Sequence, residues 1–578
     1  MLHAKGPLLT VDVSERTATA TDIDELLETH VGGRALATAL AHERIPFDAD
    51  PFGPENRAYL ATGPLQVSQT SFTGRLSMTG LSPLSDGLAS TNAGGFLSRN
   101  FADTGHSVFE LVGASDELLA IHVRDAEGDG DADAEGDGDG DAGGEPRVTF
   151  EPVPDLEGAT VSETSDYMEE HHGLGPENCI AIGPAGENLV RFASVMTFDS
   201  RAFGRGGLGA VLGSKNVKCV TFAGDSRPEL EIPDPPESEI HREAATSDDR
   251  MKRQGTTGGT EFINENFSLP TRYFEEYHFE DAAGIGGDAV EGKKYRTGTC
   301  SSCAYACKLP TRDEAGGIET EGPEFETVYA FGSSQGVGDI VDVMKANELC
   351  DELGMDTISA GVTVAAYLKS EDAFGDAELA REVTEKIAHR EGIGDLLAEG
   401  VARAHRELGV GNYTVKGVEF AAHDGRVLHG QGLSYAVANR GADHMYGGML
   451  GPEYNGEIDP EGTLGKSELL VKKENRNAVR DSAIICAFSG DYITDERLAT
   501  LLGTEYEDLL AVGARTVERE RHFNNQRGKD RKDDRLPYEI PDLEAAIEEY
   551  YEERGWNSDG TVPDDAIDGS AVPAVDSR

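Results

Sequence analysis

The stretch Lys215–Glu239, KNVKCVTFAGDSRPELEIPDPPESE, marks the point where the sequence changes from one pattern to another. It opens with an apolar run typical of a strand, and the prolines and acidic residues from Pro228 to Glu239 then break the periodicity. Before it, short apolar runs alternate with Gly, Ser, Thr and Pro turns, as in Arg57–Gly80 (RAYLATGPLQVSQTSFTGRLSMTG). We therefore expect a β-rich domain over residues 1–222, with a boundary near residue 223.

Beyond the boundary, apolar residues recur three and four positions apart, as in Asp339–Ser370 (DIVDVMKANELCDELGMDTISAGVTVAAYLKS). This spacing predicts a largely α-helical second half, so the fold class is α+β. The last residues, from Asn557, are polar, acidic and small, which predicts a loose tail.

The charge balance excludes several classes of partner. The 578 residues include 51 Lys and Arg against 107 Asp and Glu, a formal charge of −56, which repels nucleic acid and anionic membranes. No apolar run approaches the roughly 20 residues of a membrane span, and the N-terminus lacks a signal-peptide pattern, so we expect a cytoplasmic protein. Acidity of this extent suggests a halophilic source. An especially acidic run at 125–145 predicts a disordered insert within a hairpin.

Three of the seven cysteines lie in Gly298–Thr311, GTCSSCAYACKLPT, at the spacing C-x₂-C-x₃-C. Thiolates at Cys300, Cys303 and Cys307 suit zinc or an iron–sulfur cluster, and either needs a fourth ligand. A structural zinc site would more often add a second C-x₂-C pair or two nearby histidines, and neither comes after this motif in the sequence. Cys179, Cys219 and Cys350 lie in apolar strand-like or helical contexts, which leaves Cys486, in VRDSAIICAFSGDYI, as the most plausible fourth ligand.

Taken in order along the chain, these motifs resemble those of the aldehyde ferredoxin oxidoreductase family, tungsten enzymes that carry a bis-pterin cofactor and a [4Fe–4S] cluster. The resemblance rests on the cysteine motif, on RAFGRGGLGAVLGSKNVK (Arg201–Lys218), and on DELGMDT (Asp351–Thr357) and DSAIICA (Asp481–Ala487). It implies that Cys300, Cys303, Cys307 and Cys486 hold the cluster. It also implies a β-rich N-terminal cofactor base followed by two mainly helical domains, 223–417 and 418–578.

The family's two pterin-cradling segments have the form D-x-x-G-L-x-x. They match Asp351–Thr357, with Met355 in place of Leu, and Asp481–Ala487, where Ile484 and Ile485 replace Gly-Leu. Fixed carboxylates suit the N–H donors of a pterin ring, and arginines beside glycine-rich runs suit its phosphate. The resemblance also implies a Mg²⁺ between the cofactor phosphates, held by the carbonyls of Asn92 and Ala202, and places Arg75 between cluster and pterin. The predicted cofactor-binding residues are Arg75, Asn92, Gly94, Arg201, Ala202, Gly204, Asp351, Met355, Asp356, Arg440, Asp481, Ile485 and Ala487.

The activity implied by the resemblance is oxidation of an aldehyde to a carboxylic acid, with electrons leaving through the cluster to ferredoxin. Glu326, in FETVYAF, then matches the residue that activates water or accepts a proton, and His444, in GADHMYG, the donor to the carbonyl oxygen. Met445 and Tyr446 depart from the family pattern after this histidine, so the substrate is open, as is the choice between tungsten and molybdenum.

Three alternatives stay open at this point. A relative in the same superfamily could reduce an aromatic ring, with Cys350 as the spare thiolate for tungsten. A formate-dehydrogenase-like enzyme would carry its cysteines near the N-terminus, which this chain does not. A zinc-stabilised scaffold would leave the glycine, arginine and aspartate motifs unexplained. A homodimer is possible, although the residue near the expected interface-metal position is the basic Lys345.

Overall fold

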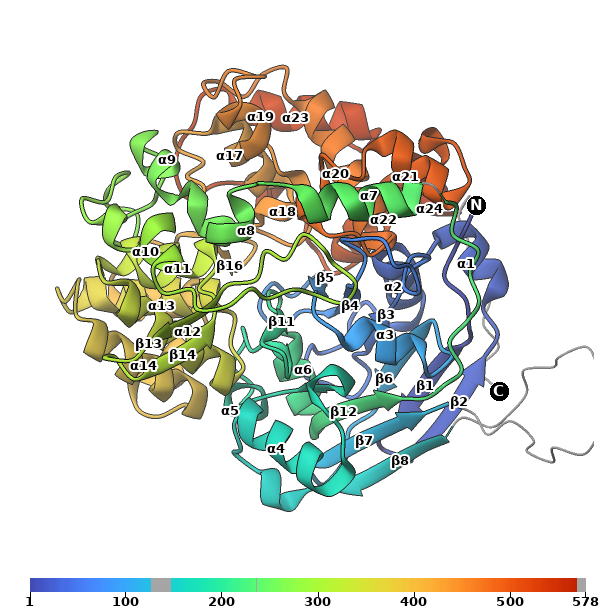
Figure 1. The fold of residues 1–578 in the computed structure, drawn as a ribbon. Helices are drawn as coiled ribbons and strands as arrows, with labels where there is room; N and C mark the ends of the chain where they lie inside the picture. Colours follow the sequence, from blue (N-terminus) through green and yellow to red (C-terminus); the bar gives the residue numbers. More distant parts are fainter. Residues whose placement is uncertain (126–146, 235, 569–578) are drawn as a thin grey trace, which may run out of the picture.

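The computed structural model describes residues 1–125, 147–234 and 236–568 (Figure 1). Within these residues, a sheet-containing N-terminal part is followed by a region that is almost entirely helical. The predicted α+β class is therefore confirmed. The acidic run expected as an insert at 125–145 lies, apart from Asp125, outside the described residues.

Two six-stranded mixed sheets form the N-terminal part. The first has the order β2-β1-β6-β3-β4-β5 and the second β11-β10-β9-β12-β7-β8. Their bounds are β1 Leu8–Asp12, β2 Thr17–Thr21, β3 Ala58–Ala61, β4 Leu76–Leu81, β5 Leu88–Ala93, β6 Val108–Val112, β7 Leu119–Arg124, β8 Arg147–Pro152, β9 Cys179–Ala181, β10 Val195–Thr197, β11 Arg201–Phe203 and β12 Val217–Ala223. The acidic run joins β7 to β8, which pair antiparallel, as a hairpin requires.

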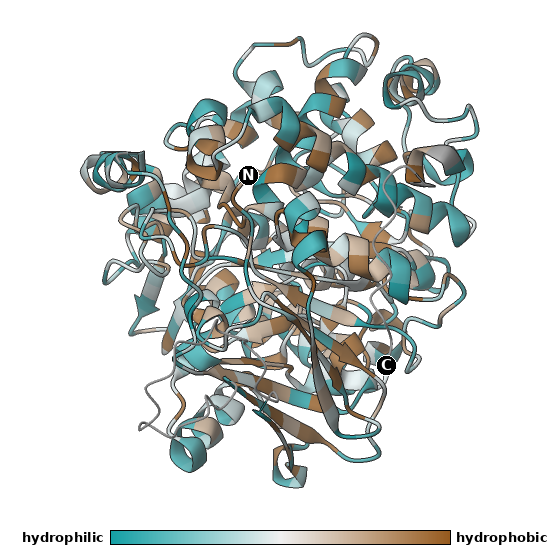
Figure 2. Cartoon of the chain, turned by 90° about the vertical axis from the view of Figure 1, so that its right-hand side faces the viewer, coloured by the Kyte–Doolittle hydropathy of each residue, from teal (hydrophilic) through white to brown (hydrophobic). Residues whose placement is uncertain are grey.

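A shared hydrophobic core joins the two sheets. Alternate residues of β7, Leu119, Ile121 and Val123, pack with Leu60 of β3 and Phe109 of β6, because successive side chains of a strand point to opposite faces. Figure 2 shows apolar residues gathered along the strands and in stripes on the helices. The described residues of this part also form the helices α1 Asp24–His30, α2 Gly33–Arg44, α3 Leu97–Ala102, α4 Val161–His172, α5 Pro184–Glu187 and α6 Leu208–Ser214.

The predicted boundary near residue 223 falls at the end of β12, and the next helix begins at Pro236. The middle of the chain contains α7 Pro236–Thr246, α8 Met251–Gln254, α9 Thr260–Glu265, α10 Gly287–Glu291, α11 Phe325–Phe331, α12 Ile340–Leu353, α13 Thr357–Ser370, α14 Ala377–His389, α15 Ile393–Leu397 and α16 Val401–Leu408, with the short pairs β13 Pro310–Asp313 with β14 Ile318–Glu321 and β15 Thr414–Val415 with β16 Val418–Glu419.

The C-terminal part contains α17 His429–Val437, α18 His444–Gly447, α19 Leu450–Tyr454, α20 Ser467–Ser482, α21 Asp495–Leu502, α22 Tyr506–Gln526, α23 Leu543–Arg554 and α24 Asp564–Asp568. The main helical core includes residues on both sides of the proposed 417/418 division, among them Val415 and Val418. The expectation of a loose tail from Asn557 is wrong for its first residues. Val562 is buried, and the carbonyl of Gly560 accepts a hydrogen bond from the buried Arg521.

Among the described residues, no helix combines the length and the apolar character needed to cross a membrane.

Candidate functional site

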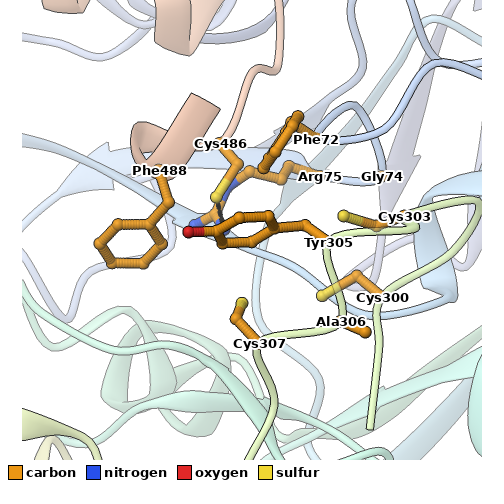
Figure 3. A pocket seen from close by; sticks show the side chains of 10 residues that line it. All are labelled: Phe72, Gly74, Arg75, Cys300, Cys303, Tyr305, Ala306, Cys307, Cys486 and Phe488. Carbon is orange, nitrogen blue, oxygen red and sulfur yellow. Dashed lines mark hydrogen bonds between the residues drawn. The ribbon is translucent and has the colours of Figure 1, made fainter. Parts of the chain in front are cut away.

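The four predicted cluster ligands converge on one pocket. Cys300, Cys303 and Cys307 come from one loop and Cys486 from the segment after α20, and in Figure 3 their sulfurs point toward the same space. The backbone N–H of Cys486 donates to the carbonyl of Phe72 at 2.8 Å, so the N-terminal part fixes the distant cysteine. The structure thus brings together residues that lie far apart in the sequence.

The loop is shaped by its backbone. An antiparallel bridge between Gly298 and Lys308 closes its ends, and a Cβ at Gly298 would lie 2.8 Å from that of Lys308. Ser302 and Ala306, each directly before a cysteine, have left-handed φ angles of 55° and 54°. These two turns direct successive sulfurs to the same side, which is how C-x₂-C-x₃-C becomes a cradle.

Burial raises the pKa of the Cys303 and Cys307 thiols, because a low-dielectric site disfavours the thiolate. A cluster must therefore displace protons as it binds. Arg75 faces the pocket and places Nη1 3.9 Å from the Cys486 sulfur, and its Nη2 donates to the carbonyl of Asn92 at 3.0 Å. A Cβ at Gly94 would lie 3.2 Å from the Cys300 sulfur, so only glycine leaves that side open.

The two predicted pterin segments share one backbone geometry. In the first, Gly354 has φ 72° and the N–H of Met355 donates to the carbonyl five residues earlier, at Cys350. In the second, Ile484 has φ 57° and the N–H of Ile485 donates to the carbonyl of Arg480. This is the helix-ending bond of a Schellman motif, which favours glycine at the left-handed position. The copy that is degenerate in sequence therefore keeps its shape, with a strained β-branched residue where the motif has glycine.

The carboxylates of these segments differ in their surroundings. Asp481 accepts from Asn92 Nδ2 at 2.6 Å and lies 3.2 Å from Nη1 of Arg34. Asp351 lines a separate hollow, and burial together with Glu348 raises its pKa. Asp356, by contrast, caps α13 by accepting from the N–H groups of Ile358 and Ser359. Its carboxylate is partly occupied by the helix end and less available to a pterin ring.

A buried network around Asp481 was not predicted. The fully buried Arg34 of α2 donates two bonds to Glu520 of α22, both at 2.8 Å, and its guanidinium lies 3.6 Å from the centre of the Tyr446 ring. Arg440 stacks on the same ring and pairs with Asp443. No local signal marks these contacts, because Arg34 and Glu520 are 486 residues apart.

The remaining predicted cofactor residues lie on β11, directly after it, or in the turn that follows Cys486. Ala202 is on β11, opposite Met196, and β11 contacts β5, which carries Asn92. Arg201 pairs with Glu321 at 2.8 Å and with Glu324 at 3.1 Å. Burial lowers the pKa of Arg201, but the nearby negative charges, above all that of Glu321, outweigh it and raise the pKa. The carbonyl of Gly204 accepts a bond from Ser194, and Ala487 opens the turn after Cys486.

Glu326 and His444, the predicted catalytic pair, face each other with 3.4 Å between Oε1 and Nε2. A third residue that the sequence did not single out, His423, places its Nε2 3.8 Å from the same oxygen. The other carboxylate oxygen accepts from the N–H of Ala422 at 2.9 Å. Burial raises the pKa of Glu326, and burial lowers that of His423, which is therefore neutral at physiological pH.

Several buried polar atoms here have no hydrogen-bond partner within the described part of the chain. They are Glu326 Oε1, His444 Nδ1, Asn92 Oδ1, Arg440 Nε and Arg201 Nε. Because buried polar atoms are rarely left unpaired, this set fits a bound group that supplies partners, as the pterin cofactor would.

Met445 is 43% exposed and Tyr446 is buried between Arg34 and Arg440, so the two residues that depart from the family pattern face in different directions.

The described residues thus contain a pocket lined by four cysteines and, separately, an acid–base pair with unpaired polar atoms. Residues 8–224 match "Aldehyde ferredoxin oxidoreductase, N-terminal domain", and residues 237–568 match "Aldehyde ferredoxin oxidoreductase, domains 2 & 3". The chain belongs to the aldehyde ferredoxin oxidoreductase family.

Relatives match over nearly their full length. The tungsten-containing aldehyde ferredoxin oxidoreductase of Pyrococcus furiosus is 31% identical, covering 94% of this chain and 95% of the relative, and that of Thermococcus kodakarensis is 32% identical, covering 93% and 94%. A more distant relative, at 27%, is the WOR-like subunit of the aliphatic sulfonate oxidoreductase of P. furiosus. These sources give no support to the expectation of a halophilic origin.

Among solved structures, the active-site complex BamBC of benzoyl coenzyme A reductase, with 1,5-dienoyl-CoA, has a TM-score of 0.80 and 20% identity, covering 100% of this chain and 98% of that one. At this identity the likeness shows a shared fold. By its family, the chain is thus an oxidoreductase of the tungsten-pterin type. Neither the relatives nor the solved structure decides which substrate it uses.

Proposed function

We propose that this enzyme oxidises an aldehyde to a carboxylic acid at a tungsten bis-pterin centre and passes the electrons through a [4Fe–4S] cluster to ferredoxin. The observation that carries the proposal is the Glu326 carboxylate, which directs a buried oxygen without a hydrogen-bond partner in the described chain toward His444, 3.4 Å away. An aldehyde oxidation needs both a proton acceptor and a donor to the carbonyl oxygen, and this pair supplies one of each.

The overall reaction is aldehyde plus water giving carboxylic acid, two protons and two electrons. Glu326, with its raised pKa, accepts a proton from the water that adds to the carbonyl carbon. His444 Nε2–H donates to the carbonyl oxygen and stabilises the charge that develops there. Ala422 holds the carboxylate in place, and neutral His423 packs beside His444 with ring centres 5.6 Å apart. The bound tungsten pterin would supply the two-electron acceptor.

The chain offers fitting residues for each cofactor. Asp351 and Asp481 are half-buried carboxylates that can accept from pterin N–H groups, and Arg440 presents an unpaired Nε. Asn92 and Ala202 lie on contacting strands, which supports the proposed Mg²⁺ between the phosphates. The four cysteines would ligate the cluster, and molybdenum in place of tungsten would use the same residues.

Ferredoxin as the acceptor agrees with the cluster pocket, which is rimmed by the 40% exposed Phe488. A cytoplasmic location and a homodimer stay predictions. The proposed ring reduction is less well supported, because Cys350, the spare thiolate, is fully buried in the main hydrophobic core.

The test begins with elemental analysis of anaerobically purified native protein. We expect about one tungsten or molybdenum and about four iron per chain. Protein loaded in this way should reduce a viologen dye when an aldehyde is added, at a rate that falls in the Glu326→Gln variant. Loaded protein that reduces no dye with short aliphatic or aromatic aldehydes would refute the aldehyde assignment. Folded native protein containing only zinc would refute the redox assignment.

A further inference from the structure

Three neighbouring strands of the second sheet carry polar residues on one face. His122 of β7 is opposite Thr149 of β8, so Glu151, two positions further along β8, lies on the same face as His122. On the other side of β7, Thr221 of β12 is paired with His122. The strand register alone therefore gathers an imidazole, a carboxylate and a hydroxyl.

A helix brings a second imidazole to this face. α4 packs over it through Met168, which shares a small core with Ala120 of β7 and Cys219 of β12. The helix begins with a capping box between Thr160 and Glu163 and ends at His172, followed by Gly173 in the left-handed conformation. Figure 1 shows α4 beside the β7–β8 end of the sheet.

Both imidazoles converge on one carboxylate oxygen. Glu151 Oε2 lies 2.9 Å from Nε2 of His122 and 2.9 Å from Nε2 of His172, and the two rings have centres 4.5 Å apart. The three atoms all lie within 4.8 Å of one another, close enough to share a single metal ion.

Outer contacts hold these groups in the orientation that ligands need. The other nitrogen of His122, Nδ1, lies 3.0 Å from the hydroxyl of Thr221, and the other oxygen of Glu151 accepts from Tyr167 at 3.1 Å. Such contacts fix the tautomer and the ring plane of a ligating histidine.

We propose that His122, Glu151 and His172 form a Zn²⁺ site that clamps α4 to the β7–β8 hairpin. Imidazole nitrogen favours zinc over the oxygen-seeking Mg²⁺ and Ca²⁺, and two histidines with one carboxylate leave a fourth tetrahedral position for water. His172 and Glu151 are partly exposed, with side chains 26% and 28% accessible, so the ion has a route from solvent. These three residues lie outside the cysteine pocket and the Glu326 cluster, so the site is independent of the catalytic proposal.

The experiment compares His172→Gln with a matched control, His171→Gln. His171 is the preceding residue on α4, where its Nδ1 contacts the carbonyl of Tyr167 and its ring stacks on the Tyr167 ring, outside the set of three ligands. Full-length, cluster-loaded protein is stripped with a mild chelator, equilibrated with Zn²⁺ in a metal buffer, and its bound zinc is counted. Because the cluster occupies the cysteines, they do not compete for zinc.

We expect the native protein and His171→Gln to bind one zinc per chain more than His172→Gln, whose affinity for zinc should fall at least about 100-fold. Zinc X-ray absorption of the native protein should show nitrogen and oxygen neighbours at about 2.0–2.1 Å, without sulfur. Thr221→Val, which keeps all three ligands, should weaken binding about 10- to 100-fold. Equal zinc content and affinity in the native protein and His172→Gln, or a sulfur shell around the bound zinc, would overturn the proposal.

Discussion

Replacing Glu326 with Gln tests the catalytic proposal with a minimal change in shape. The amide oxygen of Gln can still accept from the N–H of Ala422, now 2.9 Å from the carboxylate, so the side chain should keep its orientation. The other oxygen, which faces His444 and His423, becomes an amide nitrogen that cannot accept a proton. Loss of a general base typically slows turnover about 10²- to 10⁴-fold. That range corresponds to about 2.7–5.4 kcal/mol of transition-state stabilisation.

The same substitution should also change the stability of the folded protein in a direction that the pKa of Glu326 predicts. Burial raises the pKa of Glu326, so the folded protein binds this proton more tightly than the unfolded chain does. The group therefore favours folding at low pH, and that contribution is lost as pH rises from the ordinary glutamate pKa through the raised one. At pH 7 the ionised Glu326 carboxylate costs folding free energy, and the neutral amide of Gln does not. The melting temperature of Glu326→Gln at pH 7 should equal or exceed that of the native enzyme.

The assay is aldehyde-dependent viologen reduction across pH, with metal content and melting temperature measured on the same samples. The native enzyme should lose kcat/KM on the acid side at a pH above the ordinary glutamate pKa, because Glu326 must be deprotonated to act as a base. This limb should be absent from the residual rate of the variant. Glu319→Gln, a change in an exposed pair with Arg312, serves as the control. Turnover within about threefold of the native rate, or a loss of turnover that follows lost metal, would refute the role of Glu326.

Three further tests address other parts of the structure. Cys486→Ser should lower the iron content below about four per chain, whereas Cys350→Ala, in the core, should retain it; iron analysis of both variants distinguishes a ligand from a buried thiol. Gly94→Ala places a methyl group 3.2 Å from the sulfur of Cys300 and should shift the reduction potential of the proposed cluster or lower its occupancy, which electron paramagnetic resonance of the reduced protein would show. Arg34→Met leaves the carboxylate of Glu520 buried and unpaired, and should destabilise the fold by about 3–5 kcal/mol in denaturant titrations; a change below about 1 kcal/mol would contradict the importance of this pair.

The fold class could be predicted because it depends on local patterns. The segment Arg57–Gly80, where apolar runs alternate with turn residues, forms β3 and most of β4. The segment Asp339–Ser370, with apolar residues at helical spacing, forms α12 and α13, which are separated at Gly354. Sheet order could not be read in the same way. β1 pairs with β6, whose residues lie 100 positions further along the chain (Leu8 with Val108), and nothing in either segment specifies the other. The packed beginning of the predicted loose tail has the same explanation, since its partner Arg521 lies on α22.

The candidate site shows the same division. The cysteine spacing and the two pterin segments were visible in the sequence, and the structure places all four cysteines around one pocket. His423 was missed because its position beside Glu326 depends on the fold of the segment before α17. Its only sequence signal is a histidine directly after the buried run Phe420–Ala422. At Ile484 the backbone keeps the left-handed turn of the pterin segment although the residue is not glycine, which the sequence alone does not show.

Arg34 explains how the N-terminal part and the C-terminal helices can build one site. A chain with so few cations for its carboxylates places this guanidinium where three elements meet: α2, which carries it, α22 with Glu520, and the end of α20 with Asp481. The Glu520 pair alone would satisfy the charge, yet the third nitrogen also reaches the pterin-segment carboxylate at 3.2 Å. Burial raises the pKa of Asp481, and Arg34, together with Arg75 and Arg440, counters that rise. We therefore expect a change that separates α2 from α22 to favour the protonated form of Asp481 and to weaken the proposed pterin site.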